Sequence, residues 1–468
     1  MPSTPAGADN PVVEIKRLDP DVINRTHEYS ALSRGTNVLV TTGGAVSEAT
    51  LSLLNSAGCT VTVFGITSGA ITAPGCILAA GSAMNREACS KAVEGKAVVV
   101  HAGRPPAASS GAAAEATRNL LEAAAVAGVK GFVYASSASV VFGGQESKTI
   151  PEDAPYPRRF ADPAAASIAE AEQAVLGSNG GKNGGGGAML TCSVRAASLY
   201  GPETRGEAGE RLLLPTLASR ARDGVRAVGD GKNVVDFVYA GNVAHALLLA
   251  AEALLQAPAG AGTAAVAGRA FFVTDMEPVP FAEFSGRALS RLGYPAPGRA
   301  GGGSAGIPVL LATVLAFLLR VLALVVSPVF DFRPALTALR VAEESAVRRF
   351  DTSSASKELG YAPLWSQEEA LDITLHAATA LRNPRAKLKY IGPFSAAEVA
   401  KHSSEDDAWI IVDGKVYDVT PYLGAHPGGD AMLRNAGGDS TEGMHGPQHP
   451  ASAMEILEQH YVGVLEET

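Results

Sequence analysis

Two histidines near the C-terminal end of the chain are placed so that they can share one metal ion. His426 opens the run 426–429, His-Pro-Gly-Gly, and His449 follows 23 residues after His426. The proline fixes the backbone angle directly after His426, and the two glycines leave room for a flat macrocycle to approach the main chain. Two neutral imidazoles can coordinate opposite faces of one haem iron. His445 is the alternative second ligand.

The sequence around these histidines predicts a small domain of mixed α and β structure. Two strand-like runs flank an Asp-Gly turn, a glycine-rich run lies between the histidines, and another strand-like run comes near the end of the chain. These segments are Ala408–Val419, Asn435–Glu442 and Tyr461–Leu465. In this order they closely resemble the cytochrome b5 haem-binding domain, over residues 391–468.

This resemblance implies a role for the histidine pair. In the family both histidines ligate the iron of haem b, a role that would fall here on His426 and His449. His449 fits the family's spacing better than His445 does. Met444 stands where the family usually has phenylalanine beside the haem. Two histidine ligands leave no open position on the iron, which favours electron transfer over oxygen activation.

Farther upstream, alternating strand-like and helix-like patterns predict a dinucleotide-binding fold. Strand-like runs occupy residues 37–40, 60–64, 97–101 and 132–137, with helical patterns at 47–57 and 113–127. This alternation predicts a Rossmann-like α/β fold with a doubly wound parallel sheet. Gly43 and Gly44, directly after the first strand, are then the candidate cofactor-binding residues.

Several further motifs follow one another in a recognisable order. They are Glu122–Ala124, Gly128–Tyr134, Ser136–Phe142, Leu199–Pro202, Gly229–Tyr239, Asn242–Ala246, Phe272–Asp275 and Pro278–Phe281. Together they make residues 36–380 similar to the 3β-hydroxysteroid dehydrogenase family of extended short-chain dehydrogenases, and above all to sterol-4α-carboxylate 3-dehydrogenases. The resemblance implies an NAD(P) cofactor, a sterol ligand and a place in steroid biosynthesis.

The catalytic positions depart from this family's Tyr-x-x-x-Lys pattern. The tyrosine takes a proton as hydride leaves the substrate, and the lysine holds the nicotinamide ribose and lowers the tyrosine pKa. Here Ala164 stands at the tyrosine position and Ile168 at the lysine position. Ser137 matches the third catalytic residue, although a serine hydroxyl alone is a poor base near neutral pH. Tyr134 or Tyr156 would serve as the base only in a rebuilt site.

The dinucleotide fingerprint is incomplete as well. Gly43 keeps the first of its three glycines, whereas Val46 and Ala49 occupy the second and third positions. The acidic residue that normally receives the ribose hydroxyls after the second strand is replaced by Gly65. These changes predict weakened NAD(P) binding by a scaffold that has kept its fold.

An apolar segment, residues 307–330, predicts contact with a membrane. The nineteen residues between Pro308 and Pro328 are nearly all apolar, with Arg320 near their middle. A bilayer span takes about 20 residues, but the arginine makes spanning costly. A helix lying in the membrane interface and a buried hairpin are the alternatives. The related dehydrogenases carry a similar stretch and sit on the endoplasmic reticulum, so we expect the cytosolic face of that membrane.

Composition narrows the class of protein and its partners. Of the 468 residues 47% are hydrophobic and 18% charged, which predicts a globular protein of two or three domains. From residue 391 onward thirteen acidic residues stand against three basic ones. An acidic haem module suits a redox partner with a basic docking surface, either a reductase or an acceptor enzyme; a merely solvated acidic surface is the alternative. No basic run suggests nucleic-acid binding.

The predicted domain order has four parts. Residues 1–35 form a polar, flexible arm without the apolar core of a signal peptide, and residues 36–380 form the dehydrogenase-like domain. A basic linker at 381–390 precedes the haem module at 391–468. The cysteines, Cys59, Cys76, Cys89 and Cys192, form no CxxC pair, as is usual for reduced cytosolic thiols.

Three functions fit this organisation. The first is a membrane-associated electron-transfer protein of cytochrome b5 type, whose dehydrogenase-like domain is a scaffold that binds sterol or partner proteins. The second is an active NAD(P)-dependent 3β-hydroxysteroid dehydrogenase or decarboxylase with a haem module in the same chain. The third is a structural adaptor that brings partners together. Ala164 and Ile168 favour the first.

Overall fold

The protein divides into two compact units, which are described separately: Asn24–Thr374, and a second unit that contains Leu375–Thr468. The division falls a few residues before the predicted end of the dehydrogenase-like domain at residue 380. The computed structural model describes residues 27–33, 35–41, 43–66, 76–103, 111–143, 149–160, 163–182, 184, 187–202, 213–214, 216–217, 227–257, 265–291, 306–326, 336–382, 392–405, 407–426, 428–446, 449, 451–458 and 460–465. Residues 1–26, most of the predicted linker and Pro427 lie outside these ranges.

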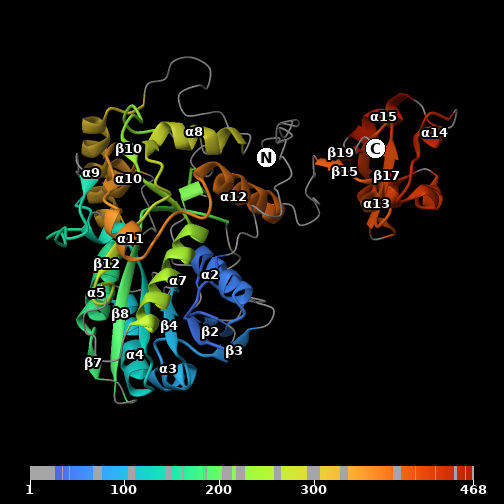
Figure 1. Ribbon diagram of the computed structural model, residues 1–468. Coiled ribbons are helices and arrows are strands. Elements are labelled where there is room, and N and C mark those ends of the chain that lie inside the picture. The colour runs from blue at the N-terminus through green and yellow to red at the C-terminus, as the bar shows by residue number, and fades with distance from the viewer. Residues whose placement is uncertain are drawn as a thin grey trace. The chain divides into compact units, whose positions relative to one another are not determined.

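The first unit is built on a largely parallel sheet (Figure 1). Its strands are β1 (Asn37–Thr41), β2 (Thr60–Ile66), β3 (Ile77–Ala80), β4 (Val98–His101), β5 (Gly131–Ser137), β7 (Gly181–Lys182), β8 (Ala188–Ala196) and β12 (Ala270–Val273). They run in the order β12-β8-β5-β4-β1-β2-β3, all parallel, and β7 adds to β8 in the antiparallel sense. The strand order reverses at β1, which confirms the predicted doubly wound, Rossmann-like fold.

Helices cover both faces of this sheet. One face carries α2 (Ala45–Ser56) packed against α7 (Ala240–Gln256), and the other carries α4 (Ala112–Val126) between α3 (Arg86–Val93) and α5 (Pro163–Gly177). The central strands β4, β5 and β8 are therefore buried almost throughout. The valine run of β4, Val98–Val100, follows from this burial, because a strand covered on both faces has no solvent side.

Further helices and several short strands complete the unit around this sheet. They are η1 (Ala138–Val141), β6 (Thr149–Ile150), β9 (Ser198–Tyr200), β10 (Val234–Val235), β11 (Phe237–Tyr239), β13 (Val279–Pro280), α8 (Phe281–Arg291), α9 (Val309–Val326), α10 (Ala338–Ser345), β14 (Arg349–Phe350), α11 (Ser353–Glu358) and α12 (Gln367–Arg382). The short strands pair as β10 with β13, β9 with β11, and β6 with β14.

The end of the predicted N-terminal arm is packed onto α7. Tyr29 and Leu32 are buried, and the Tyr29 hydroxyl lies 2.8 Å from Nδ1 of His245. The backbone N–H of Ala31 donates to Glu252 at 2.8 Å. A flexible arm was expected here because the neighbouring residues are polar. Instead, burial of the Tyr29 and Leu32 side chains attaches this end of the arm to the folded unit.

We expect the burial of His245 to make the stability of this unit depend on pH. Burial and the nearby His27 lower the pKa of His245 to about 3, whereas an exposed histidine has a pKa of about 6.5. Between these values the folded protein binds fewer protons than the unfolded chain. The contribution of His245 to the free energy of unfolding is therefore at its full value above about pH 6.5, and it falls as the pH drops from about 6.5 to about 3.

Urea unfolding followed by the fluorescence of buried Trp365 measures this dependence. The variant His245→Asn keeps a hydrogen-bond acceptor for Tyr29 but does not titrate, so its stability should decline less with acid. Wild-type and variant curves that fall in parallel would contradict the assignment.

The second unit holds a five-stranded sheet in the order β15-β19-β18-β17-β16. Its elements are β15 (Gly392–Phe394), α13 (Ala396–Val399), β16 (Ser403–Ser404), β17 (Asp407–Val412), β18 (Lys415–Asp418), η2 (Thr420–Ala425), η3 (Gly429–Asn435), α14 (Thr441–Met444), α15 (Ala451–Glu458) and β19 (Tyr461–Leu465). The predicted hairpin is confirmed, because β17 and β18 pair in the antiparallel sense. Asp413 and Gly414 form its turn, with φ of 51° and 71°, the left-handed geometry that two-residue hairpin loops need.

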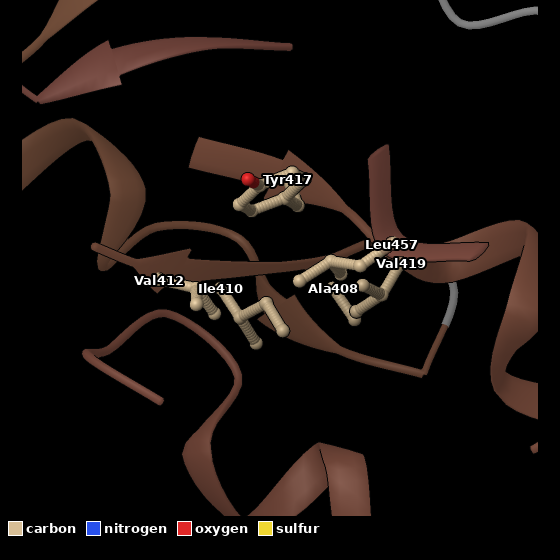
Figure 2. Packing of buried hydrophobic residues seen from close by; sticks show 6 residues of the cluster. All are labelled: Ala408, Ile410, Val412, Tyr417, Val419 and Leu457. Atoms are coloured by element: carbon tan, nitrogen blue, oxygen red, sulfur yellow. The ribbon is translucent and has the colours of Figure 1, made fainter. Parts of the chain in front are cut away.

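Strand β17 separates two apolar cores because alternate residues point to opposite faces. Trp409 and Ile411 pack with Phe394, Val399 and Val416. The second core, shown in Figure 2, consists of Ala408, Ile410, Val412, Tyr417, Val419 and Leu457. Leu423, Met444 and Met454 pack against this second core. They lie within five residues of His426 or His449 in the sequence, so the second core is on the side of the sheet nearest the histidine pair.

Candidate functional site

The structure brings His426 and His449 together. His426 directly follows η2, and His449 lies in the segment between α14 and α15. Their ring centroids are 6.1 Å apart and the rings are tilted by 37°. Two imidazoles at this separation would hold one haem iron between them. The pair is thus spaced for one iron between the two rings.

Local contacts orient both rings. Nδ1 of His449 lies 3.0 Å from the carbonyl oxygen of Gly443. A carbonyl can only accept, so Nδ1 carries the proton and Nε2 is left for a metal. A Cβ on Gly428 would lie 2.8 Å from Cε1 of His426. A side chain at position 428 would therefore collide with the ring of His426 unless that ring moved.

The surroundings of the pair suit a flat apolar group. Six apolar side chains are only partly buried and pack on the core of Figure 2: Leu423, Met432, Leu433, Ala436, Met444 and Met454. Partly exposed apolar side chains in a unit that also holds two facing imidazoles are the combination that would hold a porphyrin. Met444 is one of these side chains, at the position where phenylalanine was noted as usual, so the residues present fit haem.

His445, the alternative ligand, is engaged elsewhere. Its Nε2 lies 2.8 and 3.0 Å from the two carboxylate oxygens of Asp413, and both side chains are about half exposed. The geometry therefore pairs His426 with His449.

In the turn predicted to bind a dinucleotide, polar backbone groups form hydrogen bonds within the chain. Gly43 and Gly44 have φ of 152° and 121° and lead into α2. The N–H of Gly43 donates to Oγ of Ser47 at 3.2 Å, and that hydroxyl donates to the carbonyl of Gly44 at 2.8 Å. A buried serine thus takes up a backbone N–H of the kind that a phosphate would use in a working fingerprint. The sequence analysis did not single out Ser47.

The other fingerprint positions are equally altered. Val46 is only 2% exposed, so its branched side chain fills space in the first turn of α2. Gly65 lies at an irregularity of β2 with φ of 96°, a conformation that side-chain-bearing residues rarely adopt. The position expected to hold an acidic residue therefore favours glycine.

The two replaced catalytic positions lie one turn apart on α5. Ala164 is exposed and Ile168 is 7% exposed, and neither side chain carries a polar atom. Ser137 ends β5, and its Oγ accepts hydrogen bonds from the N–H and the hydroxyl of Ser139. This serine therefore caps η1 in the structure.

The tyrosines considered as substitutes are not placed as bases. The hydroxyl of Tyr156 donates to Glu172 at 2.7 Å, and burial together with this carboxylate raises the pKa of Tyr156. Tyr134 is buried in the sheet, with its ring 5.4 Å from that of His101.

A buried ionic network, which the sequence analysis missed, holds α5 in place. Glu172 is fully buried and pairs with Arg195 of β8 at 2.8 Å. Ser193 donates to the same carboxylate at 2.9 Å. Because a buried charge is tolerated only when it is paired and hydrogen-bonded, this network fixes α5 against the sheet.

Helix α9 contains most of the predicted apolar segment. Ala312 and Ala316 are buried against a cluster formed by Val228, Leu336 and Val341. Nine large apolar side chains of the helix are exposed: Val309, Leu310, Leu311, Val314, Leu315, Phe317, Leu318, Val321 and Leu322. Within the described ranges, no helix combines the length and apolar character that crossing a bilayer requires. The predicted buried hairpin is absent from the described part of this segment, which is a single helix.

Comparison with known proteins agrees with both units. A model of the 3-beta hydroxysteroid dehydrogenase/isomerase family matches residues 78–300, and a model of the cytochrome b5-like haem/steroid binding domain matches residues 395–466. The decarboxylating sterol-4-alpha-carboxylate 3-dehydrogenase of Mus musculus is 32% identical over 372 residues, which cover 78% of this chain and 96% of that protein.

A plant relative and a solved structure extend this picture. The 3beta-hydroxysteroid-dehydrogenase/decarboxylase isoform 2 of Arabidopsis thaliana is 35% identical over 66% of this chain, and the match spans about half, 53%, of that relative's length. The crystal structure of a dTDP-glucose 4,6-dehydratase from Streptomyces venezuelae superposes with a TM-score of 0.53 at 19% identity, covering 74% of this chain and 98% of the other. The last likeness concerns the fold alone. The chain belongs to the 3-beta hydroxysteroid dehydrogenase/isomerase family and carries a C-terminal cytochrome b5-like domain.

Proposed function

We propose that this protein binds haem b through its C-terminal unit and transfers single electrons. The observation that carries the proposal is the spacing of His426 and His449, whose ring centroids lie 6.1 Å apart. When bound, haem supplies a one-electron couple of ferric and ferrous iron. The two imidazoles would hold the group from both sides, and the partly buried apolar side chains of the unit would contact its ring. Reconstitution with haem and its alanine variants, argued in the Discussion, tests the proposal.

The dehydrogenase-like unit serves, in this proposal, as a scaffold without hydride chemistry. Ala164 and Ile168 cannot transfer a proton, and the hydroxyl of Tyr156 is tied to a carboxylate. The names of the mouse and plant relatives support a setting in sterol metabolism, and the ligand proposed for this unit is a sterol.

An active NAD(P)-dependent 3β-hydroxysteroid dehydrogenase is the second candidate function. The doubly wound sheet and the relatives' names support it. It requires a proton acceptor other than the residues at positions 164 and 168, and it is tested at the end of the Discussion.

We propose that α9 rests in the interface of a membrane, for which the cytosolic face of the endoplasmic reticulum is the expected location. The helix touches its own unit through a narrow stripe of small residues, Ala312 and Ala316, and turns its large side chains outward. A helix that lies in the interface buries such side chains among acyl chains, and Arg320, which is exposed, can extend to the headgroups. This arrangement avoids carrying the arginine across the bilayer.

Charge on the outer face of α9 should abolish this binding. Leu310 and Phe317 are 79% and 65% exposed and lie two turns apart, so Leu310→Glu with Phe317→Glu replaces two inserted side chains. Burial of each is worth about 1.5–3 kcal/mol, so the vesicle-bound fraction should fall at least about tenfold in flotation with phosphatidylcholine vesicles. Val126→Glu is the matched control, since Val126 is 80% exposed at the end of α4. Equal flotation of the double variant and wild type would refute membrane contact through α9.

The partner in electron transfer is proposed to dock through a basic surface. The haem unit carries a large excess of acidic residues, among them Asp439 and Glu442 beside α14. Complementary charge raises the rate of encounter and makes it fall with ionic strength.

A further inference from the structure

The carbonyl that orients His449 belongs to a very short helix. Gly443 accepts from Nδ1 of His449 at 3.0 Å, and it lies in α14, which has four residues. A single helical turn gains little stability from its own hydrogen bonds. The position of this carbonyl therefore depends on what holds α14 from outside.

The hairpin turn between β17 and β18 holds both ends of α14. At its start, the N–H of Asp413 donates to Oγ1 of Thr441 at 2.9 Å. At its end, Nε2 of His445 meets the carboxylate of Asp413 at 2.8 and 3.0 Å. The N–H of His445 also donates to the carbonyl of Thr441 at 3.1 Å, which ties the residue to the helix.

The turn is a rigid anchor for these contacts. Asp413 has φ of 51° and is followed by Gly414, and the flanking Val412 and Lys415 are paired in the strand ladder. The approach to α14 is fixed as well, because the N–H of Ile411 donates to the carbonyl of Gly438 at 2.9 Å. A continuous set of contacts thus runs from β17, through Asp413 and His445, to α14 and His449.

We propose that His445 is a positioning residue for the haem: paired with Asp413, it fixes α14 so that the carbonyl of Gly443 sets the orientation of His449. This inference rests on the proposed function of the unit. It assigns a role to the histidine that sequence spacing offered as a rival ligand. Because the two side chains are 55% and 46% exposed, their pairing adds little to the stability of the fold. Its effect is expected in the retention of haem.

The test uses the haem-loaded full chain and measures the rate of haem loss to excess apomyoglobin, together with the midpoint potential. His445→Ala and Asp413→Asn should each speed haem loss about two- to fivefold, which is the size of effect expected from losing an exposed pair. Both variants should shift the midpoint potential in the same direction as each other. Asparagine tolerates the positive φ of position 413. The double variant should lose haem no faster than the faster single variant, because both changes remove one interaction. His445→Gln, which keeps a donor for Asp413, should restore most of the retention.

A second histidine–aspartate pair provides the control. His402 lies 2.8 Å from Asp407 and stacks on Trp409, in the other core of the same unit. His402→Ala should leave haem loss and potential unchanged, although His402 is the more buried histidine.

Two results would overturn the inference. Equal rates for wild type, His445→Ala and Asp413→Asn would remove any role in positioning, and a matching effect of His402→Ala would reduce it to general destabilisation. A wild-type chain that takes up no haem overturns the proposed function and this inference together, whereas a normal haem spectrum with equal loss rates overturns this inference alone.

Discussion

Replacing either His426 or His449 with alanine should abolish stable six-coordinate haem binding. The wild-type chain, reconstituted with haem, should give a sharp Soret band that shifts on reduction with dithionite, because both axial positions are filled by imidazole. Each alanine variant removes one of two ligands that the fold places 6.1 Å apart. Haem content per chain, measured after gel filtration, should then fall severalfold, and the residual spectrum should lose its six-coordinate character.

The control for this prediction is another histidine of the same unit. His402→Ala removes an imidazole from the opposite core and should keep the wild-type spectrum and haem content. Gly428→Ala should lie between the two cases, since the added Cβ meets the ring of His426 at 2.8 Å and must displace it. Normal spectra and normal haem content in both ligand variants would refute the axial assignment.

The fold of the unit that contains the candidate haem ligands was largely predictable, because its sequence signals are local. The His-Pro-Gly-Gly run, the Asp-Gly turn and the two strand-like runs each constrain a few neighbouring residues, and β17, β18 and the turn at Asp413 appear where these patterns placed them. The doubly wound sheet was predictable for a related reason, because its buried parallel strands β4 and β5 are short and mainly apolar runs.

Contacts between distant segments could not be predicted from the sequence. Glu172 and Arg195 are 23 residues apart and look like ordinary surface charges until the sheet brings them together in the core. Ser47 has no sequence signal that distinguishes it from a helix residue, yet its hydroxyl completes the turn at Gly43. The pairing of Asp413 with His445 spans 32 residues, and only the fold decides that this histidine faces a carboxylate.

The family's catalytic positions were partly predictable: their place in the sequence was, but the contacts of their helix were not. Comparison with the family's Tyr-x-x-x-Lys pattern located Ala164 and Ile168, and the structure places both on α5, one turn apart. It also adds that the helix is retained by a buried carboxylate whose partners are Arg195, Ser193 and Tyr156. A helix held by such structural contacts can keep its place whatever residues stand at positions 164 and 168.

The second large effect expected is the absence of dehydrogenase activity. The full chain, incubated with NAD or NADP and a 3β-hydroxysterol, should form reduced cofactor no faster than buffer does, because a positioned proton acceptor alone is worth about 10²- to 10⁴-fold in rate and none lies at positions 164 and 168. Calorimetric titration with NADH should show no saturable heat, since Ser47 and Val46 occupy the cofactor turn.

A designed variant makes this prediction sharper. Ala164→Tyr with Ile168→Lys restores the missing pair on α5 but leaves Val46 and Gly65 unchanged, so turnover should stay at background for want of bound cofactor. Ser137→Ala supplies the opposing test. Its hydroxyl caps η1 in the structure, so the variant should match wild type in the assay. If instead wild type turns over and Ser137→Ala abolishes that turnover, the serine touches substrate, the dehydrogenase site is intact in an altered form, and the scaffold role proposed for this unit is wrong.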